Sequence, residues 1–227
     1  MAAEDFIITR KRKKYKFARF AELPNCYEAQ EYREIASQFS ADSYVSLELG
    51  AGTGLFSLEL ARLHPDRQFV AADVKADRLY TGALQANEAG IGNIAFVRIN
   101  AAQLPEIFPP QSVADLWLTF ADPFPKDRHA KHRMTHPAFL EIYRQLLAPG
   151  DSRFCFKTDN EPLFKWSLEQ LVAFGFNFKF LSFDVHAADA RAVDFDIMTT
   201  YEKRYVREGK PICALVGAFD SCLKERP

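Results

Sequence analysis

The stretch LELGAGTGLF, residues 47–56, decides the fold that this sequence predicts. It begins in an apolar run with strand character, and the apolar periodicity over residues 55–63 predicts a helix directly after it. Three glycines occupy the turn between the two, where missing side chains let a ligand approach the backbone amides closely. A tight turn that binds nothing is the alternative, but the position favours a nucleotide-type pocket. The glycines are Gly50, Gly52 and Gly54.

Outward from this stretch, short apolar runs alternate with amphipathic helical stretches. This alternation predicts an α/β fold, in which a parallel sheet is covered by helices on both faces. The last two apolar runs have little helix between them, which predicts an antiparallel pair at one edge. A further helix is expected over residues 26–39, packed ahead of the first strand. The seven predicted strands are 44–49, 68–73, 94–99, 113–120, 153–159, 176–185 and 212–219, and the other predicted helices are 55–63, 75–89, 138–147 and one that ends at Leu171.

Composition bounds the class of protein. The chain has 227 residues, of which 48% are hydrophobic, and this suits one large folded domain or one domain with an extension. Its formal net charge of -1 argues against a protein that binds nucleic acid or anionic membranes over its whole surface. No apolar run approaches the roughly 18 residues of a membrane span, and the first residues lack a secretory apolar core. We therefore expect a cytoplasmic protein.

The four cysteines lie far apart, without a CxxC pair or a Cys/His spacing typical of metal ligands. We therefore expect neither a zinc site nor a disulfide framework, and the sequence shows no metal site of another kind. Buried thiols in a reducing compartment are the simplest interpretation. The cysteines are Cys26, Cys155, Cys213 and Cys222.

Polar residues that follow the first three strands suggest which cofactor the pocket takes. A dinucleotide-binding fold usually shows GxGxxG, whereas this chain has GxGxG preceded by Glu48, an acid that suits the charged sulfonium or amine of S-adenosylmethionine. Asp73 closes the second strand, where a carboxylate accepts both hydroxyls of an adenosine ribose or caps the next helix. Asn100 and Ala101 follow the third strand and could bind an adenine edge, although Asn100 also suits a plain turn.

The segment TFADPFPKDRHAKHR, residues 119–133, places an acid between rings and then a dense basic run after the fourth strand. Asp122 would face the reactive end of the cofactor, because open α/β sheets bind ligands at this edge. The flanking prolines stiffen the backbone, and Phe124 offers a flat wall for an aromatic base. A rigid loop with solvated charges is the alternative. The side chains that could bind phosphates here are Lys126, Arg128, His129, Lys131, His132 and Arg133.

Two more basic stretches predict contact with a polyanion. RKRKKYKFAR, residues 10–19, surrounds two aromatic rings with cations, a pattern typical of an RNA-binding arm. A nuclear-localisation-like signal or a solvated tail is the alternative. The other stretch, which could extend the same surface, contains Lys203, Arg204, Arg207 and Lys210.

Four motifs in this order give the chain a recognisable pattern. The glycine turn, FADPFPKDRHAKHR, FKTDN at 156–160 and TTYEKRYVREGKPI at 199–212 resemble the tRNA (guanine-N7)-methyltransferase family, which modifies a guanine in the variable loop of tRNA. The resemblance runs from about residue 10 to 219. It implies a class I S-adenosylmethionine-dependent methyltransferase with a Rossmann-like fold, a mostly parallel seven-stranded sheet that has helices on both faces and an antiparallel edge strand.

The resemblance also implies roles for particular residues. S-adenosylmethionine is the expected cofactor and tRNA the expected partner, with no metal and no membrane, and we expect a monomer or homodimer. Residues 1–40 would form the basic arm and packing helix, and residues 41–227 the methyltransferase domain. Asp122 matches the family's proposed catalytic residue. The matches to cofactor contacts are Glu48, Asp73, Asn100 and Asp122, and the matches to RNA contacts are Lys126, Asp159, Thr199, Thr200, Tyr201 and Glu202.

The chain departs from the family's usual residues at several positions. Phe124 stands where the family usually has Trp, and Ala121 where it usually has Pro. The family commonly has Asp or Glu at the positions of Asp73 and Asn100, and the carbonyl oxygen of Asn100 can still accept a hydrogen bond from an adenine amino group. The phenyl ring at position 124 keeps a stacking face but lacks the indole donor.

The expected chemistry requires few catalytic groups. Guanine N7 carries an in-plane lone pair and no proton at neutral pH, so its attack on a sulfonium methyl needs no general base. Positioning should dominate catalysis. Asp122, with Asp159 and Glu202, could accept from the guanine N1–H and amino group and favour the cationic product.

Two other kinds of function are compatible with parts of the sequence. DPFP, residues 122–125, also resembles the D/N-PP-Y/F motif of exocyclic amino methyltransferases, although the basic run and FKTDN favour the N7 family. A non-catalytic RNA-binding or nucleotide-sensing relative is the second alternative, which the presence of all the acids disfavours. An oxidoreductase comes last, because GxGxxG is absent from the first turn.

Overall fold

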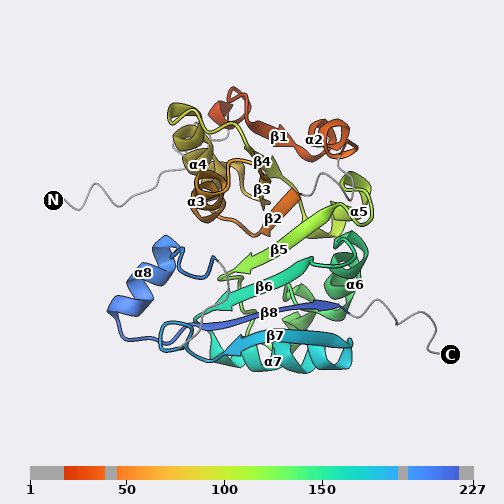
Figure 1. The fold of residues 1–227 in the computed structure, drawn as a ribbon, viewed down its shortest axis with the longest axis vertical. Helices are drawn as coiled ribbons and strands as arrows, with labels where there is room; N and C mark the ends of the chain where they lie inside the picture. The colour runs from red at the N-terminus through yellow and green to blue at the C-terminus, as the bar shows by residue number, and fades with distance from the viewer. Residues whose placement is uncertain (1–17, 39–44, 189–193, 220–227) are drawn as a thin grey trace.

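The computed structural model describes residues 18–38, 45–188 and 194–219, and its main element is an eight-stranded sheet (Figure 1). The strand order is β1-β4-β3-β2-β5-β6-β8-β7. All pairs from β1 to β6 are parallel, whereas β8 is antiparallel to both β6 and β7. The strands are β1 Cys26–Glu28, β2 Val45–Leu49, β3 Gln68–Asp73, β4 Ile94–Arg98, β5 Val113–Thr119, β6 Arg153–Thr158, β7 Phe176–Ser182 and β8 Cys213–Phe219.

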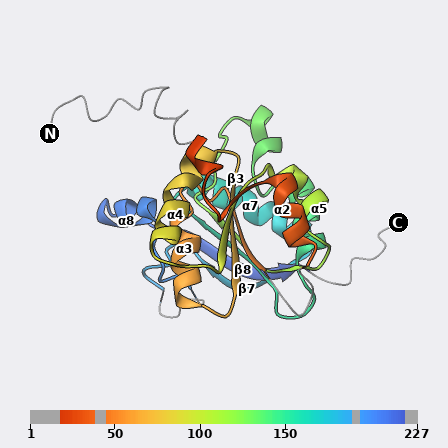
Figure 2. The same ribbon diagram turned by 90° about the horizontal axis from the view of Figure 1, so that it is seen from above.

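Helices cover both faces of this sheet. Figure 2 shows α3 and α4 on one side and α2, α5 and α7 on the other. Side chains alternate along the strands, so Leu116 and Leu118 enter one apolar core while Trp117 enters the other. The helices are α2 Ala29–Ala36, α3 Leu55–Leu63, α4 Ala76–Glu88, α5 Leu104–Ile107, α6 Pro137–Leu146, α7 Glu161–Ala173 and α8 Thr200–Arg207, with short 3-10 helices η2 Ala101–Gln103 and η3 Asp127–His132.

The predicted α/β architecture is confirmed, including the mostly parallel sheet and the antiparallel pair at one edge. The helix expected over residues 26–39 is wrong at its start, because residues 26–28 form β1, which pairs with β4 and makes an eighth strand. The helix begins at Ala29, after Glu28 and Glu31 form a capping box. A three-residue edge strand is too short to show a period, so tertiary pairing decides it.

One part of the sheet is covered by irregular chain. The connection between β7 and α8, here called the crossing segment (residues 183–188 and 194–199 of the described chain), packs on the face that carries Trp117. The rings of Phe195 and Trp117 meet edge to face at 5.6 Å between centroids. Lys157 Nζ, fully buried on β6, donates to the carbonyl oxygens of Phe195 at 3.4 Å and Ile197 at 3.2 Å.

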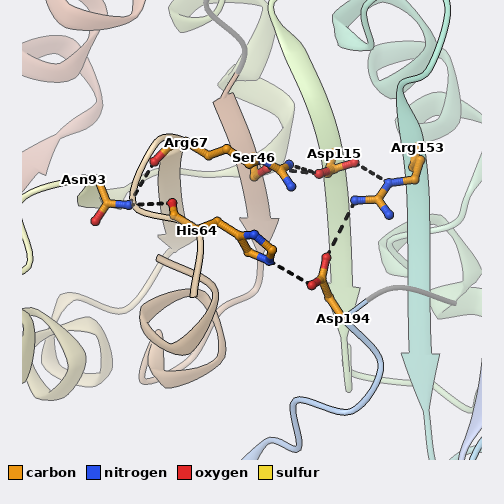
Figure 3. Close-up of polar contacts among 7 residues, drawn as sticks. All are labelled: Ser46, His64, Arg67, Asn93, Asp115, Arg153 and Asp194. Atoms are coloured by element: carbon orange, nitrogen blue, oxygen red, sulfur yellow. Dashed lines mark hydrogen bonds and ion pairs between the residues drawn. The ribbon is translucent and has the colours of Figure 1, made fainter. Parts of the chain in front are cut away.

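A buried polar network fixes the crossing segment to the N-terminal ends of the strands (Figure 3). Asp115 on β5 accepts hydrogen bonds from Arg67 and from Arg153 Nε, the latter at 2.7 Å. Asp194 of the crossing segment lies 3.0 Å from His64 Nε2 and 3.8 Å from Arg153 Nη2. Burial alone would raise the pKa of Asp115, but the hydrogen bond and charge of Arg153 and the charge of Arg67 hold that pKa below its usual value.

Other predictions of the sequence concern absences. Within the described ranges, no helix is both long and apolar enough to cross a membrane. The same residues contain no group of three or more His, Cys, Asp or Glu side chains that could hold a metal ion. Cys26, Cys155 and Cys213 are buried and free, and burial raises the pKa of the Cys26 thiol to about 12. Cys222 lies outside the described residues.

Candidate active site

The loops that follow β2, β3, β4, β5 and β6 meet at one edge of the sheet and surround two neighbouring cavities. The first has a volume of about 300 Å³ and is lined by Asp73, Asn100 and Phe124, among others. The second has a volume of about 640 Å³, and its walls include Glu48 and Asp159. Both cavities are bordered by Gly50, Arg78, Phe120, Ala121 and Asp122.

The glycine turn forms the floor between the two cavities. Gly50, Gly52 and Gly54 have φ angles of 69°, 58° and 69°, a left-handed conformation that side chains rarely adopt. A Cβ on Gly54 would lie 2.5 Å from the ring of Phe96, so this glycine permits close packing of helix on sheet. A Cβ on Gly50 or Gly52 would meet no atom within 4 Å, so these two border open space that a ligand could fill.

Asp73 and Asn100 line the first cavity and also fix local backbone. Asp73 Oδ2 accepts from the N–H of Gly52 at 2.9 Å, and its Oδ1 accepts from the N–H of Lys75 at 2.8 Å. Each carboxylate oxygen keeps a second lone pair for a ligand hydroxyl. Asn100 Oδ1 accepts from the N–H of Ala102 at 3.0 Å, so the turn role is present while the residue still borders the cavity.

Glu48 lies on the wall of the second cavity but is only 2% exposed. It accepts hydrogen bonds at 2.6 Å from the hydroxyls of Ser57 and Thr119. Burial raises the pKa of Glu48 to about 7, although the hydrogen bonds from those hydroxyls oppose the shift. This carboxyl is therefore poised to ionise when a cation enters the cavity.

The loop that carries Asp122 is held in an unusual backbone conformation. Phe120 and Phe124 have φ angles of 53° and 42°, values that are uncommon outside glycine and that cluster at functional sites. The N–H of Phe120 donates to the carbonyl of Lys157 at 2.9 Å. Arg133 Nη2 donates to the carbonyl of Phe124 at 3.1 Å. Between these anchors Asp122 is exposed and borders both cavities.

The basic run after this loop divides into two groups. Lys126, Arg128 and Lys131 lie exposed on or beside η3 and remain available for an anionic ligand. The prediction that Arg133 binds phosphate is wrong, because its side chain is buried. Its guanidinium lies 4.5 Å from the centroid of the Trp166 ring and holds the Asp122 loop from beneath.

Residues from β6 and α8 form the far wall of the second cavity. Asp159, Thr199 and Tyr201 line it, and Tyr201 is 54% exposed. Glu202, expected to contact RNA, is fully buried and borders neither of the two cavities. Its carboxylate pairs with Lys157 Nζ at 2.7 Å. Burial lowers the pKa of Lys157, and the neighbouring Glu202 charge opposes that shift.

Glu202 also anchors the start of α8. The Thr199 hydroxyl accepts from the N–H of Glu202 at 3.1 Å, and Glu202 Oε2 accepts from the N–H of Thr199 at 3.3 Å, a reciprocal capping box. His186 Nε2 lies 3.0 Å from the other carboxylate oxygen. The TxxE spacing alone would have predicted this cap.

The side chain of Thr200 and residues 10–17 of the basic arm lie outside what the structure describes.

Several residues that border the cavities were not predicted from the sequence as site residues, among them Arg78, Phe120 and Tyr205. Arg78 and Phe120 border both cavities, and Tyr205 borders the second. The rings of Phe120 and Tyr205 lie 6.0 Å apart between centroids. Phe120 immediately follows the fourth strand, a position that could have identified it. Tyr205 lies one helical turn beyond Tyr201 and Glu202, at the i+4 and i+3 spacings of a helix face, whereas no predicted site residue lies one turn before Arg78.

Comparison with known proteins fits this arrangement. Residues 42–215 match a family described as "Putative methyltransferase". The tRNA (guanine-N(7)-)-methyltransferase of Brevibacillus brevis is 38% identical over 175 residues, which cover 77% of this chain and 80% of that protein.

Solved structures resemble the fold at lower identity. The 16S rRNA methyltransferase KamB has a TM-score of 0.61 at 18% identity, covering 84% of this chain and 93% of its own. A 16S rRNA (adenine(1408)-N(1))-methyltransferase from Catenulisporales acidiphilia, solved with cosubstrate SAM, has a TM-score of 0.55 at 13% identity, covering 87% and 94%. The sequence match to the Brevibacillus protein extends over most of both chains. This chain belongs to the tRNA (guanine-N7)-methyltransferase family.

Proposed function

We propose that this chain transfers a methyl group from S-adenosylmethionine to N7 of a guanine in the variable loop of tRNA. The observation that carries the proposal is the position of Asp122, an exposed carboxylate on the wall shared by the two cavities and beside Gly50 of the glycine turn. A group bound in one cavity and a base bound in the other would meet at this residue. Family membership supports the same reaction.

The residues of the first cavity fit the cofactor. Asp73 would hold the ribose hydroxyls, Asn100 and Ala101 would border the adenine, and the open side of Gly50 and Gly52 would admit the chain that follows. When bound, S-adenosylmethionine supplies a methyl group on positively charged sulfur. Glu48 complements that positive charge or the neighbouring ammonium from within the second cavity.

The protein's contribution to the reaction is positioning and electrostatics. Guanine N7 needs no base, so Asp122 and Asp159 act by accepting from the guanine N1–H and amino group and by favouring positive charge on the purine. Alignment of two bound reactants is worth up to about 7 to 11 kcal/mol in favourable cases. The strained loop and its buried Arg133 anchor keep Asp122 in place for this alignment.

Glu202 has a different role from the one that the sequence suggested. Because its carboxylate is buried against Lys157, it acts on the substrate side through Thr199 and Tyr201, which it holds at the cavity wall by capping α8. Lys126, Arg128 and Lys131, with the arm at residues 10–19, supply phosphate contacts. We also propose that the protein acts in the cytoplasm as a monomer or homodimer. Residues 1–40 would form the basic arm and packing helix, and residues 41–227 would form the methyltransferase domain.

Methyl transfer to unmodified tRNA tests the function. The purified chain is incubated with tritiated S-adenosylmethionine and total tRNA from cells that lack this modification, and the nucleosides are separated after digestion. We expect 7-methylguanosine as the labelled product. Labelled N6-methyladenosine or N4-methylcytidine would instead support an exocyclic amino methyltransferase. tRNA binding without any label would support the non-catalytic relative.

A further inference from the structure

Two basic side chains at the start of α4 border the first cavity and have no role in the reaction described above. Lys75 occupies the N-cap position of α4 without a side-chain cap, and Arg78 follows one turn later, so the two side chains lie on the same side of the start of the helix. Both are exposed, and both border the first cavity. Arg78 also borders the second cavity. Neither side chain forms a hydrogen bond or ion pair with another residue in the part of the chain that the structure describes.

The chemistry of the cofactor does not account for this pair. An adenosine held by Asp73 and Asn100 carries no anionic group, so the adenosine itself offers Lys75 no opposite charge. The sulfonium and ammonium of S-adenosylmethionine are cations, which a guanidinium at the boundary of the cavities would repel. The terminal carboxylate is the one anionic group of the cofactor, so the two side chains together carry more positive charge than the cofactor can neutralise.

The lining of the first cavity also includes the basic element η3. His132 at the end of η3 borders the first cavity, and Lys126, Arg128 and Lys131 are exposed next to it. Positive groups therefore flank Asp122 from two separate elements. A nucleotide that enters the second cavity has a phosphate on each side of its sugar, so a strand that passes the cavities needs cations at both sides. Arg suits a phosphate because its planar fork donates two parallel hydrogen bonds.

We propose that Lys75 and Arg78 form an RNA phosphate site, which binds the backbone beside the target nucleotide separately from η3. The proposal rests on the proposed function for the identity of the substrate. It makes α4 part of the RNA surface as well as a wall of the cofactor cavity. The target base would then be drawn toward Asp122 from both flanks.

Binding measurements test the site without relying on catalysis. The variants Lys75→Gln, Arg78→Gln and the double variant are titrated with an unmodified tRNA transcript at several salt concentrations, and separately with S-adenosylmethionine. We expect the double variant to bind tRNA roughly 5- to 20-fold more weakly and the slope of log affinity against log salt to become shallower by about 1 to 2. Affinity for S-adenosylmethionine should stay within about twofold, and Arg78→Lys should recover part of the loss.

Arg62→Gln is the matched control, because Arg62 is an exposed arginine on α3 that pairs with Glu59 at 2.8 Å and borders neither cavity. It should bind tRNA like the wild type. In the wild-type chain, tRNA should also protect Lys75 from acetylation, measured by mass spectrometry, whereas S-adenosylmethionine should not. The acetylation measurement uses only the wild-type chain, so its result does not depend on whether a variant folds.

Several results would overturn the phosphate site. A wild-type salt slope in the double variant, or acetylation of Lys75 unaffected by tRNA, would do so. Weaker binding of S-adenosylmethionine with unchanged tRNA binding would assign Arg78 to the cofactor carboxylate. The proposed function is tested separately. It fails if the wild-type chain binds tRNA but yields no 7-methylguanosine, and in that case the salt slopes of tRNA binding can still be measured.

Discussion

At Glu48, protonation of the carboxyl favours folding, whereas its ionisation favours the binding of a cation. Its pKa of about 7 in the folded chain, against an ordinary 4.5, means that the folded state binds the proton more tightly than the unfolded state. The stabilisation by the protonated carboxyl is complete below pH 4.5 and is lost as the pH rises through about 7. A cation in the second cavity would instead favour the ionised form.

The variant Glu48→Gln should separate these effects. The amide of the Gln side chain does not ionise, so the variant keeps its stability as the pH rises while the wild type loses stability. At pH 8 the free energy of unfolding of the variant should therefore exceed that of the wild type by up to about 3 kcal/mol. Near pH 5 the two proteins should differ little. Affinity for S-adenosylmethionine at pH 7.5 should fall, because the charge that complements it is gone. Urea unfolding and ligand titration at both pH values measure this, and parallel pH profiles for the two proteins would contradict it.

Arg133 offers a second prediction for one side chain. Arg133→Gln removes the donors to the carbonyl oxygens of Pro123 and Phe124 and the contact with the Trp166 ring. The free energy of unfolding should fall by about 1 to 3 kcal/mol, and kcat should fall because the Asp122 loop loses its anchor. Lys131→Gln, at an exposed position two residues earlier, should instead raise the KM for tRNA. Steady-state kinetics distinguish the two, and a KM effect alone in Arg133→Gln would refute the anchoring role.

Residues differ in how far the sequence could specify them. Asp122, Asp73 and Asn100 were predictable because each directly follows a strand, and parallel strands end at one edge. The roles of Arg133 and Glu202 were predicted wrongly, because the sequence of a motif does not indicate whether a charged side chain faces solvent or a buried partner. Their burial depends on Trp166 and Lys157, which are distant in sequence and contribute no local signal.

Among the elements, the crossing segment links the two ends of the sheet. Asp194 joins it to His64 and Arg153 at the N-terminal ends of the strands, and the chain then continues to Thr199 at the cavity. Asp194 has a φ of 71°, which Asn and Asp tolerate better than most other side chains. Sequence periodicity predicted the strand before this segment but extended it wrongly to residue 185, whereas β7 ends at Ser182. It did not predict the rest of the segment, because an irregular connection has no period.

Substitution of Asp194 tests whether the segment positions α8. Asp194→Ala should lose the contacts with His64 and Arg153, lower kcat and raise the KM for tRNA, because Thr199 and Tyr201 shift at the cavity wall. Affinity for S-adenosylmethionine should remain, since Asp73 and Asn100 are on other loops. Asp194→Asn keeps the backbone conformation and a hydrogen-bond acceptor, so it should retain most of the activity. Equal loss of cofactor and tRNA binding in Asp194→Ala would indicate general unfolding instead.

At the scale of the whole molecule, the net charge is small and the location of the charges matters more than their sum. The net charge is -1, yet the edge that bears the cavities gathers exposed cations from α4, η3 and α8. The mostly parallel sheet, which the alternating pattern predicted, brings these separate stretches together. The extra edge strand β1 and the helix α8 were not predicted, because short elements are decided by their neighbours.

This distribution predicts a steep salt response of tRNA binding. With roughly six phosphate contacts and about 0.7 to 0.9 released ions per contact, the slope of log affinity against log salt should be near -4 to -5. Removal of residues 1–17 should make the slope shallower if the basic arm contributes. Fluorescence anisotropy across a salt series measures this. A flat response in the full-length chain would rule out the electrostatic surface.

Single-turnover methyl transfer to a tRNA transcript tests the role of Asp122 most directly. With saturating S-adenosylmethionine and enzyme in excess, Asp122→Ala should form 7-methylguanosine about 100-fold or more slowly than the wild type, the scale of losing one preorganised electrostatic group. Asp151→Ala, an exposed acid outside both cavities, serves as the control and should react at the wild-type rate. An Asp122→Ala rate equal to the wild-type rate would contradict the central claim that this carboxylate presents the guanine to the methyl donor.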